Sequence, residues 1–111
     1  MNLHRGDVVT CALAGEFGKP RPVVVLQSDL FNATHPSVTV CPITSHLQEA
    51  PLFRVPLVKG PISGLKLESQ AMVDKLSTVR RERIKAVIGR LETDDLERVD
   101  AAVMRWLGLK A

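Results

Sequence analysis

Only one stretch of this 111-residue chain has the spacing of an amphipathic helix, and it lies near the C-terminal end. The apolar positions that share one stripe at helical spacing are Leu96, Val99, Val103, Trp106 and Leu107. Thr93 or Asp94 is the expected N-cap, and Gly108 is typical of a C-terminal stop. We expect the stripe to pack on a sheet or on a second subunit, with Trp106 as an anchor of that packing.

The rest of the chain consists of short runs typical of strands, separated by Gly, Pro and Asn. The expected strands are Asp7–Ala14, Arg21–Ser28, Val38–Ser45, Phe53–Leu57, Leu67–Leu76 and Val87–Leu91. We expect a connection at 29–37 and a short turn or helical piece at 78–83. One domain over residues 1–111 is predicted, mainly β, with a small and strongly curved antiparallel sheet or barrel. Ferredoxin-like and doubly wound folds need interleaved helices, which this pattern lacks.

The run from Pro22 to Leu26 is apolar at every position. Such a run predicts a strand that is buried on both faces, either at the centre of a sheet or under a partner subunit. Together with the helix stripe, it offers more apolar surface than a chain of this length should bury alone. We therefore expect a homodimer.

Composition excludes several classes of function. Aromatic residues make up 4% of the chain and Tyr is absent, which argues against the stacking platforms of generic single-strand binders.

Cys11 and Cys41 both fall in expected strands and are predicted to be buried, reduced thiols. The three histidines lack the spacing of metal ligands, so no metal and no cofactor are expected. No secretory signal and no bilayer-length apolar run are recognised, which favours the cytoplasm. The net charge of +3 mildly favours an anionic partner.

Two hydroxyl groups follow a proline at the end of the third expected strand. Pro42 gives no N–H to a strand ladder, so pairing should loosen there and leave Thr44 and Ser45 at the rim of the sheet. A nucleophilic serine would need a base, but Ser45 and His46 are neighbours on a strand and point to opposite faces. A hydroxyl that only donates a hydrogen bond to a charged oxygen needs no base, and this is the interpretation we prefer.

Arg21 lies between two prolines, just after Lys19. Each proline fixes its own φ and restricts the residue before it, so the backbone at Arg21 is stiff. A guanidinium held there can bind phosphate oxygens at a low entropy cost, and its fork matches their geometry. The alternative is an ordinary surface arginine.

Further charges lie after the fifth expected strand. Asp74 and Lys75 are near its end and can reach the same rim. A basic cluster follows, made of Arg80, Arg81, Arg83 and Lys85. This cluster is either a solvated turn or a flank that contacts phosphates.

Several motifs in register together resemble the MazF/PemK family of toxins. They are Arg5-Gly6-Asp7-Val8-Val9, Arg21-Pro22-Val23-Val24-Val25-Leu26, Cys41-Pro42-Ile43-Thr44-Ser45, Gly64-Leu65 before Ser69, Met72-Val73-Asp74 and Ile88-Gly89-Arg90-Leu91. The resemblance implies an SH3-like barrel with a C-terminal helix, shared with the CcdB toxins and assembled as a homodimer. It also implies the toxin of a type II toxin–antitoxin module: a metal-independent, sequence-specific endoribonuclease that cuts single-stranded RNA, usually mRNA, and is blocked by a cognate antitoxin.

The same resemblance places the family's catalytic arginine on Arg21 and its catalytic threonine on Thr44. RNA supplies its own nucleophile, the 2′-hydroxyl, so charge stabilisation and alignment are what the protein must provide. Further RNA contacts are expected at Lys19, Ser45, Lys75, Arg80 and Arg81. Glu16 is another expected contact and a candidate general base.

Two alternatives stay open at this point. One is a toxin of the same fold that poisons DNA gyrase by binding, as CcdB does; the Arg21-Pro22 and Pro42–Ser45 motifs favour the ribonuclease branch. The other is an inactive member that only binds RNA or the antitoxin. Lys75, where the family commonly has Gln, is the departure that makes this second alternative conceivable.

Overall fold

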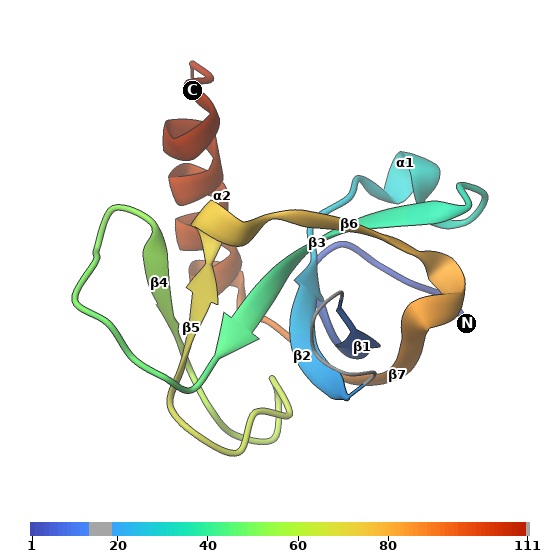
Figure 1. Ribbon diagram of the computed structural model, residues 1–111, viewed down its shortest axis with the longest axis horizontal. Helices are drawn as coiled ribbons and strands as arrows, with labels where there is room; N and C mark the ends of the chain where they lie inside the picture. Colours follow the sequence, from blue (N-terminus) through green and yellow to red (C-terminus); the bar gives the residue numbers. More distant parts are fainter. Residues whose placement is uncertain (14–18, 111) are drawn as a thin grey trace.

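The computed structural model describes residues 1–13 and 19–110 and shows seven strands with a long C-terminal helix (Figure 1). The strands are β1 (Asp7–Ala12), β2 (Pro20–Val25), β3 (Ser37–Thr44), β4 (Arg54–Leu57), β5 (Ser69–Met72), β6 (Ser77–Arg80) and β7 (Ile84–Arg90). The helical elements are α1 (Asp29–Asn32), the 3₁₀ turns η1 (Val73–Lys75) and η2 (Arg81–Arg83), and α2 (Thr93–Leu107).

The strands form one antiparallel sheet in the order β4-β5-β3-β2-β1-β7, and β6 also pairs with β3. In Figure 1 the sheet curves so strongly that β2, β3, β6, η2, β7 and β1 trace a ring beside the helix. Within the described residues no pairing between β6 and β7 closes the ring, because η2 makes the corner between them. The mainly β fold with a C-terminal helix is confirmed, and its barrel is an incompletely closed one.

Strand β3 changes partner along one of its edges. Its first half, Ser37–Val40, pairs with β6, and its last two residues pair with β5. Pro42 lies in the gap between these two pairings, where an N–H would have no strand to bond. The expected loosening at Pro42 therefore takes the form of a switch between partner strands, and β3 ends at Thr44, one residue before the predicted end.

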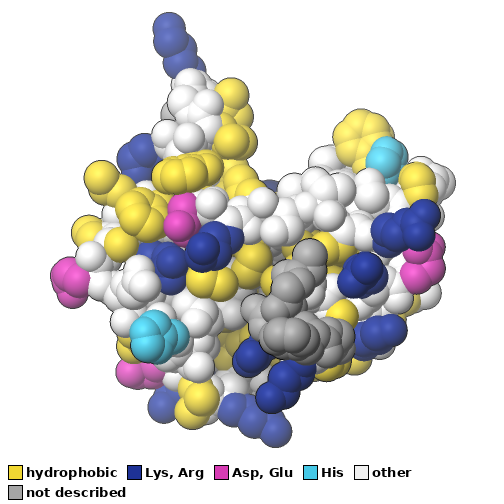
Figure 2. Space-filling view, viewed as in Figure 1, with side chains coloured by type: hydrophobic (Ala, Val, Ile, Leu, Met, Phe, Trp, Pro, Cys, Tyr) yellow, Lys and Arg dark blue, Asp and Glu magenta, His cyan; other side chains and the backbone are white. Residues whose placement is uncertain are grey.

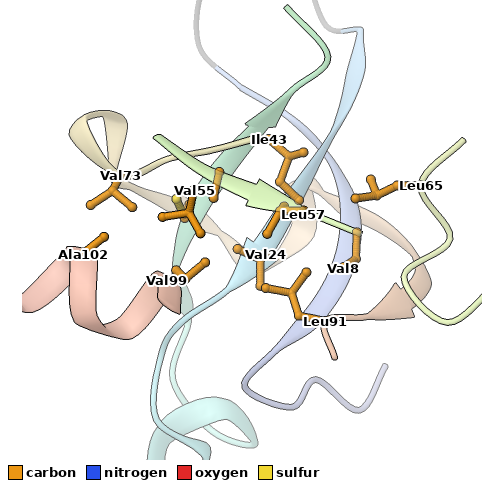
Figure 3. Packing of buried hydrophobic residues seen from close by; sticks show 12 residues of the cluster. Val8, Val24, Ile43, Val55, Leu57, Leu65, Val73, Leu91, Val99 and Ala102 are labelled. Carbon is orange, nitrogen blue, oxygen red and sulfur yellow. The ribbon is translucent and has the colours of Figure 1, made fainter. Parts of the chain in front are cut away.

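The central strands are buried on both faces. One face of the sheet packs against α2 in a cluster that contains Val8, Val24 and Val99, all fully buried (Figure 3). The other face forms a second cluster around Val23 and Val40, also fully buried. Each such valine contributes about 1.5–3 kcal/mol by leaving water. The prediction of a central, doubly buried β2 is confirmed, and the chain covers both faces itself, so this burial does not require a second subunit.

Helix α2 begins at Thr93, and its N-cap is Glu92, whose side chain makes no capping hydrogen bond. The predicted cap at Thr93 or Asp94 is therefore wrong. The acidic residue that matters is Asp95, which is 2% exposed and accepts a hydrogen bond of 2.8 Å from Val58 N. A carboxylate fits the positive end of the helix dipole, and here it also ties the helix to the end of β4. At the other end Gly108 adopts φ +71°, which confirms the predicted stop.

The apolar stripe of α2 is only partly used. Val99 is fully buried, and Leu96 and Val103 pack at the edge of the same cluster. Trp106 and Leu107 are 49% and 54% exposed, because the end of the helix extends beyond the sheet (Figure 1). Trp106 packs on Phe53 with ring centroids 5.8 Å apart, so it is a peripheral contact more than an anchor. No helix in the described residues is long and apolar enough to cross a membrane.

Three sequence predictions of local structure are corrected. The strand expected over Leu67–Leu76 is interrupted by η1, because the chain must leave one half of β3 and return to the other half. The turn expected at 78–83 is a strand up to Arg80 and a 3₁₀ turn after it. The connection at 29–37 contains one helical turn, whose N-cap Ser28 accepts a hydrogen bond from Leu30 N.

Candidate active site

A groove of about 510 Å³ opens where β2 begins and β3 ends. Its walls come from β2, β3, β5 and the segment just before β5. The lining residues are Leu13, Arg21, Pro22, Pro42, Ile43, Thr44, Ser45, His46, Leu65, Lys66, Leu67, Ser69 and Met72. The lining is thus partly apolar, and its polar groups are two basic side chains, three hydroxyls and one imidazole.

Arg21 and Thr44 meet in this groove because of the strand register. Strands β2 and β3 pair antiparallel with Val23 opposite Pro42. Continuing the same register by two residues places Arg21 opposite Thr44, and both residues line the groove. Because both side chains line the same groove, one phosphate group bound there can contact both of them.

The Thr44 hydroxyl is oriented by the loop that follows it. His46 N donates a hydrogen bond of 3.0 Å to Thr44 Oγ1. With this acceptor role taken, the O–H of Thr44 is available to an acceptor in the groove. Ser45 and His46 also line the groove but make no hydrogen bond to each other, in agreement with their unsuitability as a catalytic dyad.

Lys66 is a groove residue that the sequence analysis missed. Its segment is fixed by close backbone packing: a Cβ on Gly64, which has φ +74°, would lie 2.1 Å from Ile88 O. A Cβ on Gly89 would lie 2.4 Å from Ile62 O. These two glycines let the segment press against β7, which brings Lys66 to the groove. The Gly64 motif was the available signal, but it says nothing about which side chain the turn presents.

Lys75 lies in an adjoining hollow of about 470 Å³ that shares Leu13, Pro42 and Met72 with the groove. Ser77 and Thr78 also line this hollow. Asp74, in contrast, is not at the rim: its Oδ1 lies 3.4 Å from Nε of Arg54, and Arg54 is 6% exposed.

Two predicted RNA contacts lie at the other end of β3. Arg80 is exposed and pairs with Ser37, seven residues before Thr44, which corresponds to about 23 Å along a strand. The guanidinium of Arg81 donates to the backbone carbonyls of Asn32 and His35. The structure thus gives Arg81 a structural task, and it does not bring either arginine to the groove.

The remaining predicted contacts are near the groove or outside the described structure. Lys19 is exposed and directly precedes β2, two residues from Arg21. Glu16 lies outside the described residues. Figure 2 shows Lys and Arg side chains gathered along the lower and right-hand parts of the face in view, so this side of the molecule is suited to an anionic partner.

The two cysteines, Cys11 and Cys41, are buried and do not line the groove. Burial, together with the nearby carboxylate of Asp74, raises the pKa of Cys41 to about 12. Burial also raises the pKa of Cys11. Both thiols stay protonated near neutral pH, which confirms the prediction of buried, reduced cysteines. In the described part of the chain no group of three His, Cys, Asp or Glu side chains is placed to hold a metal ion.

Solved structures with this architecture include toxin–antitoxin complexes. An endoribonuclease in complex with its cognate antitoxin, from a mycobacterial species, superposes with a TM-score of 0.83 at 17% identity, covering 98% of each chain. A MazE–MazF structure from Deinococcus radiodurans gives a TM-score of 0.81 at 22% identity, covering 99% of each chain. At these identities the similarity shows the fold.

Sequence similarity goes further. The "Probable endoribonuclease MazF" of Mycolicibacterium smegmatis is 43% identical over 108 residues, which cover 96% of this chain and 98% of the relative. "Endoribonuclease EndoA" of Bacillus subtilis is 29% identical over 113 residues, which cover 98% of this chain and 97% of the relative. Residues 4–107 match the family described as "PemK-like, MazF-like toxin of type II toxin-antitoxin system". The chain therefore belongs to the PemK/MazF-like family of toxins.

Proposed function

We propose that this toxin is an endoribonuclease that cleaves single-stranded RNA in the groove between Arg21 and Thr44. The observation that supports it best is that Arg21, at the start of β2, and Thr44, at the end of the neighbouring β3, line one groove. The full-length similarity to relatives named endoribonuclease MazF and EndoA supports the same class of reaction.

In the proposed reaction the RNA 2′-oxygen attacks the adjacent phosphorus. The new bond joins O2′ to phosphorus as the O2′–H proton leaves, and the bond from phosphorus to the 5′-oxygen breaks as that oxygen takes up a proton. The products are a 2′,3′-cyclic phosphate and a 5′-hydroxyl, with no proton gained or lost overall. Arg21 binds the non-bridging oxygens and stabilises the charge that develops on them. Thr44 donates its O–H to the same phosphate. Neither role requires a protein nucleophile or a metal.

Other residues are proposed as contacts to the rest of the RNA. Ser45 lines the groove, Lys75 lines the adjoining hollow, and Lys19 precedes Arg21. Arg80 and Arg81 are left with a general attraction for the RNA backbone, because they lie at the other end of β3. Glu16 remains a prediction as an RNA contact and general base.

The proposed partners are a cognate antitoxin and a second copy of the chain. Similar structures are described as complexes with a cognate antitoxin or with MazE. An antitoxin that covers the groove would block access of RNA to Arg21 and Thr44. The half-exposed end of α2 offers apolar surface for a homodimer. A cytoplasmic location fits an enzyme that acts on mRNA.

The direct test is to incubate the purified protein with a long mixed RNA in excess EDTA and to map the cleavage ends. We expect discrete cuts at a short sequence, with cyclic phosphate and 5′-hydroxyl ends. Tight RNA binding without any cut at high protein concentration would contradict the proposal and indicate an inactive member. Absence of cleavage together with inhibition of DNA gyrase would also contradict it and indicate a CcdB-like toxin.

A further inference from the structure

The side-chain amide of Gln70 holds the loop that leaves Thr44. Gln70 Nε2 donates to Gln48 O at 2.9 Å, and Gln48 N donates to Gln70 Oε1 at 3.1 Å. The amide therefore satisfies both backbone groups of one residue, as a neighbouring strand would. Both the donor and the acceptor of the amide are used, so its orientation is set by the bonds it makes.

The position of this clamp links it to the groove. In the β3–β5 register Gln70 is directly opposite Thr44. The clamp ties Gln48, four residues after Thr44, back to the strand beside Thr44, and so closes a small loop over residues 44–48. Within that loop His46 N donates to Thr44 Oγ1. The bond that orients the Thr44 hydroxyl is therefore made by a loop that Gln70 closes.

Little else in the described structure holds this loop. Residues 45–49 are all exposed, and Leu47 is 51% exposed, so no buried side chain anchors them. The side-chain hydrogen bonds recorded for these residues are the His46–Thr44 bond and the two bonds to Gln70. The geometry of the loop thus depends strongly on the side-chain amide of Gln70.

We propose that Gln70 is a positioning residue for RNA cleavage, which acts by holding the 44–48 loop so that the Thr44 hydroxyl points at the scissile phosphate. This inference rests on the proposed function of Thr44. It assigns Gln70 no contact with the RNA. Misplacing a catalytic group by about 1 Å can cost up to ~100-fold in rate. We expect Gln70→Ala to lower kcat about tenfold and to leave KM close to the parent value, because phosphate binding by Arg21 is retained.

A carboxyl at this position gives a readout that a merely structural role would not produce. In Gln70→Glu the ionised carboxylate can still accept from Gln48 N, but it has no donor and repels Gln48 O. The protonated acid restores both bonds, since its C=O accepts and its O–H donates. A glutamate in water has a pKa of about 4.3, and a facing carbonyl oxygen raises it. The kcat of Gln70→Glu relative to the parent should therefore rise severalfold as the pH falls from about 7 to about 5.

The chain contains a matched control at the far end of β3. Gln27 Nε2 donates to Ser37 O and its Oε1 accepts from Thr39 N, both at 3.1 Å, so it makes the same kind of clamp away from the groove. Gln27→Glu should change thermal stability with pH in the same direction, while its kcat relative to the parent stays flat. A flat kcat ratio for Gln70→Glu as well would overturn the proposal.

A double-mutant cycle separates this inference from the proposed function. If Gln70 acts through Thr44, then Thr44→Ala combined with Gln70→Ala should cleave no more slowly than Thr44→Ala alone. Additive losses would overturn the positioning role. If Thr44→Ala cleaves slowly but Gln70→Ala cleaves at the parent kcat, the positioning role is also overturned. The proposed function is unaffected by that result. A Thr44→Ala variant at the parent kcat would overturn the role of Thr44 in the proposed function and this inference with it.

Discussion

The two ends of β3 are built from the same kinds of parts and have different tasks. At the Ser37 end the strand pairs with β6, a glutamine clamps its backbone, and Arg81 caps carbonyls of the preceding connection. At the Thr44 end the strand pairs with β5, another glutamine clamps the loop that follows, and Arg21 lines an open groove. Glutamine, arginine and threonine occur at both ends.

The difference between the ends lies in what surrounds the polar groups. The guanidinium of Arg81 donates hydrogen bonds to backbone carbonyls, so this side chain stabilises the fold. Arg21 and Thr44 face a groove at the edge of the sheet, where a phosphate can reach them. We therefore expect the position of a side chain relative to the two ends of β3, and not its residue type, to decide whether it supports the fold or the proposed reaction. Three predictions test this contrast, and a fourth concerns the buried middle of β3.

The largest effect is expected from Arg21→Ala. Removing a charged donor to the developing oxyanion should lower the cleavage rate about 10²–10³-fold. Single-turnover cleavage of a defined RNA measures this loss. Arg90, an exposed arginine on β7 outside the groove, provides the control, and Arg90→Ala should cleave at the parent rate. If Arg21→Ala cleaves RNA at the parent rate, then the groove at the Thr44 end has no catalytic arginine and the contrast between the two ends of β3 fails.

A threonine from each end of β3 gives the next test. Thr44→Ala should lower kcat about 10-fold to 100-fold, because the phosphate loses one hydrogen-bond donor, and Thr44→Ser should recover most of it. Thr39→Ala at the other end should leave kcat unchanged. If Thr44→Ala and Thr39→Ala lower kcat equally, then Thr44 has no role in the reaction that a threonine outside the groove lacks.

Arg81→Ala tests the structural end. Its guanidinium donates to the carbonyl of the buried Asn32 and, in exposed hydrogen bonds, to the carbonyl of His35, so the loss of unfolding free energy should be about 1–2 kcal/mol. Urea unfolding measures this change. At saturating RNA the kcat should stay at the parent value, because the side chain lies far from Thr44. A fall in kcat without a fall in stability would place Arg81 in the reaction and contradict the assignment.

The smallest effect concerns Cys41, which lies between the two ends. Its pKa rises from an ordinary value of 9.0 to about 12 on folding. Between these values the folded chain keeps the proton and the unfolded chain releases it, so stability is full below about pH 9 and falls as the pH rises. At about pH 10 the loss should be about 1.4 kcal/mol. Urea unfolding at about pH 8 and about pH 10 measures the fall in unfolding free energy between these pH values. The fall should be smaller for Cys41→Ala than for the parent, because the variant lacks the contribution of the Cys41 thiol.

Local patterns predicted much of the fold. The apolar run of β2, the terminal helix and the reduced cysteines are properties of consecutive residues, and each is confirmed. The break between β5 and β6 was missed because it depends on β3 having two partners on one edge, which no local pattern records. The task of Asp95 at the start of α2 was missed for a similar reason, because its buried carboxylate accepts a hydrogen bond from Val58, 37 residues away.

The candidate site divides in the same way. Arg21 was noticed because two prolines stiffen it, and Thr44 because it follows Pro42, both of which are signals within a few residues. Lys66 was missed because its place at the groove depends on glycine contacts between the 60–67 segment and β7. The task of Arg81 was hidden for the same reason, since its partners lie 46 and 49 residues earlier in the chain.

The sequence by itself determined the central strands, the terminal helix and the presence of side chains whose chemistry suits a phosphate, because these depend on propensity, periodicity and side-chain chemistry. Only the tertiary structure decided that Arg21 and Thr44 share a groove, while Arg81 donates hydrogen bonds to backbone carbonyls at the other end of β3. The physical reason is that strand register and the switch of partners at Pro42 come from pairing between distant segments. The energy of that pairing depends on both partners at once, and no single stretch of the chain contains it.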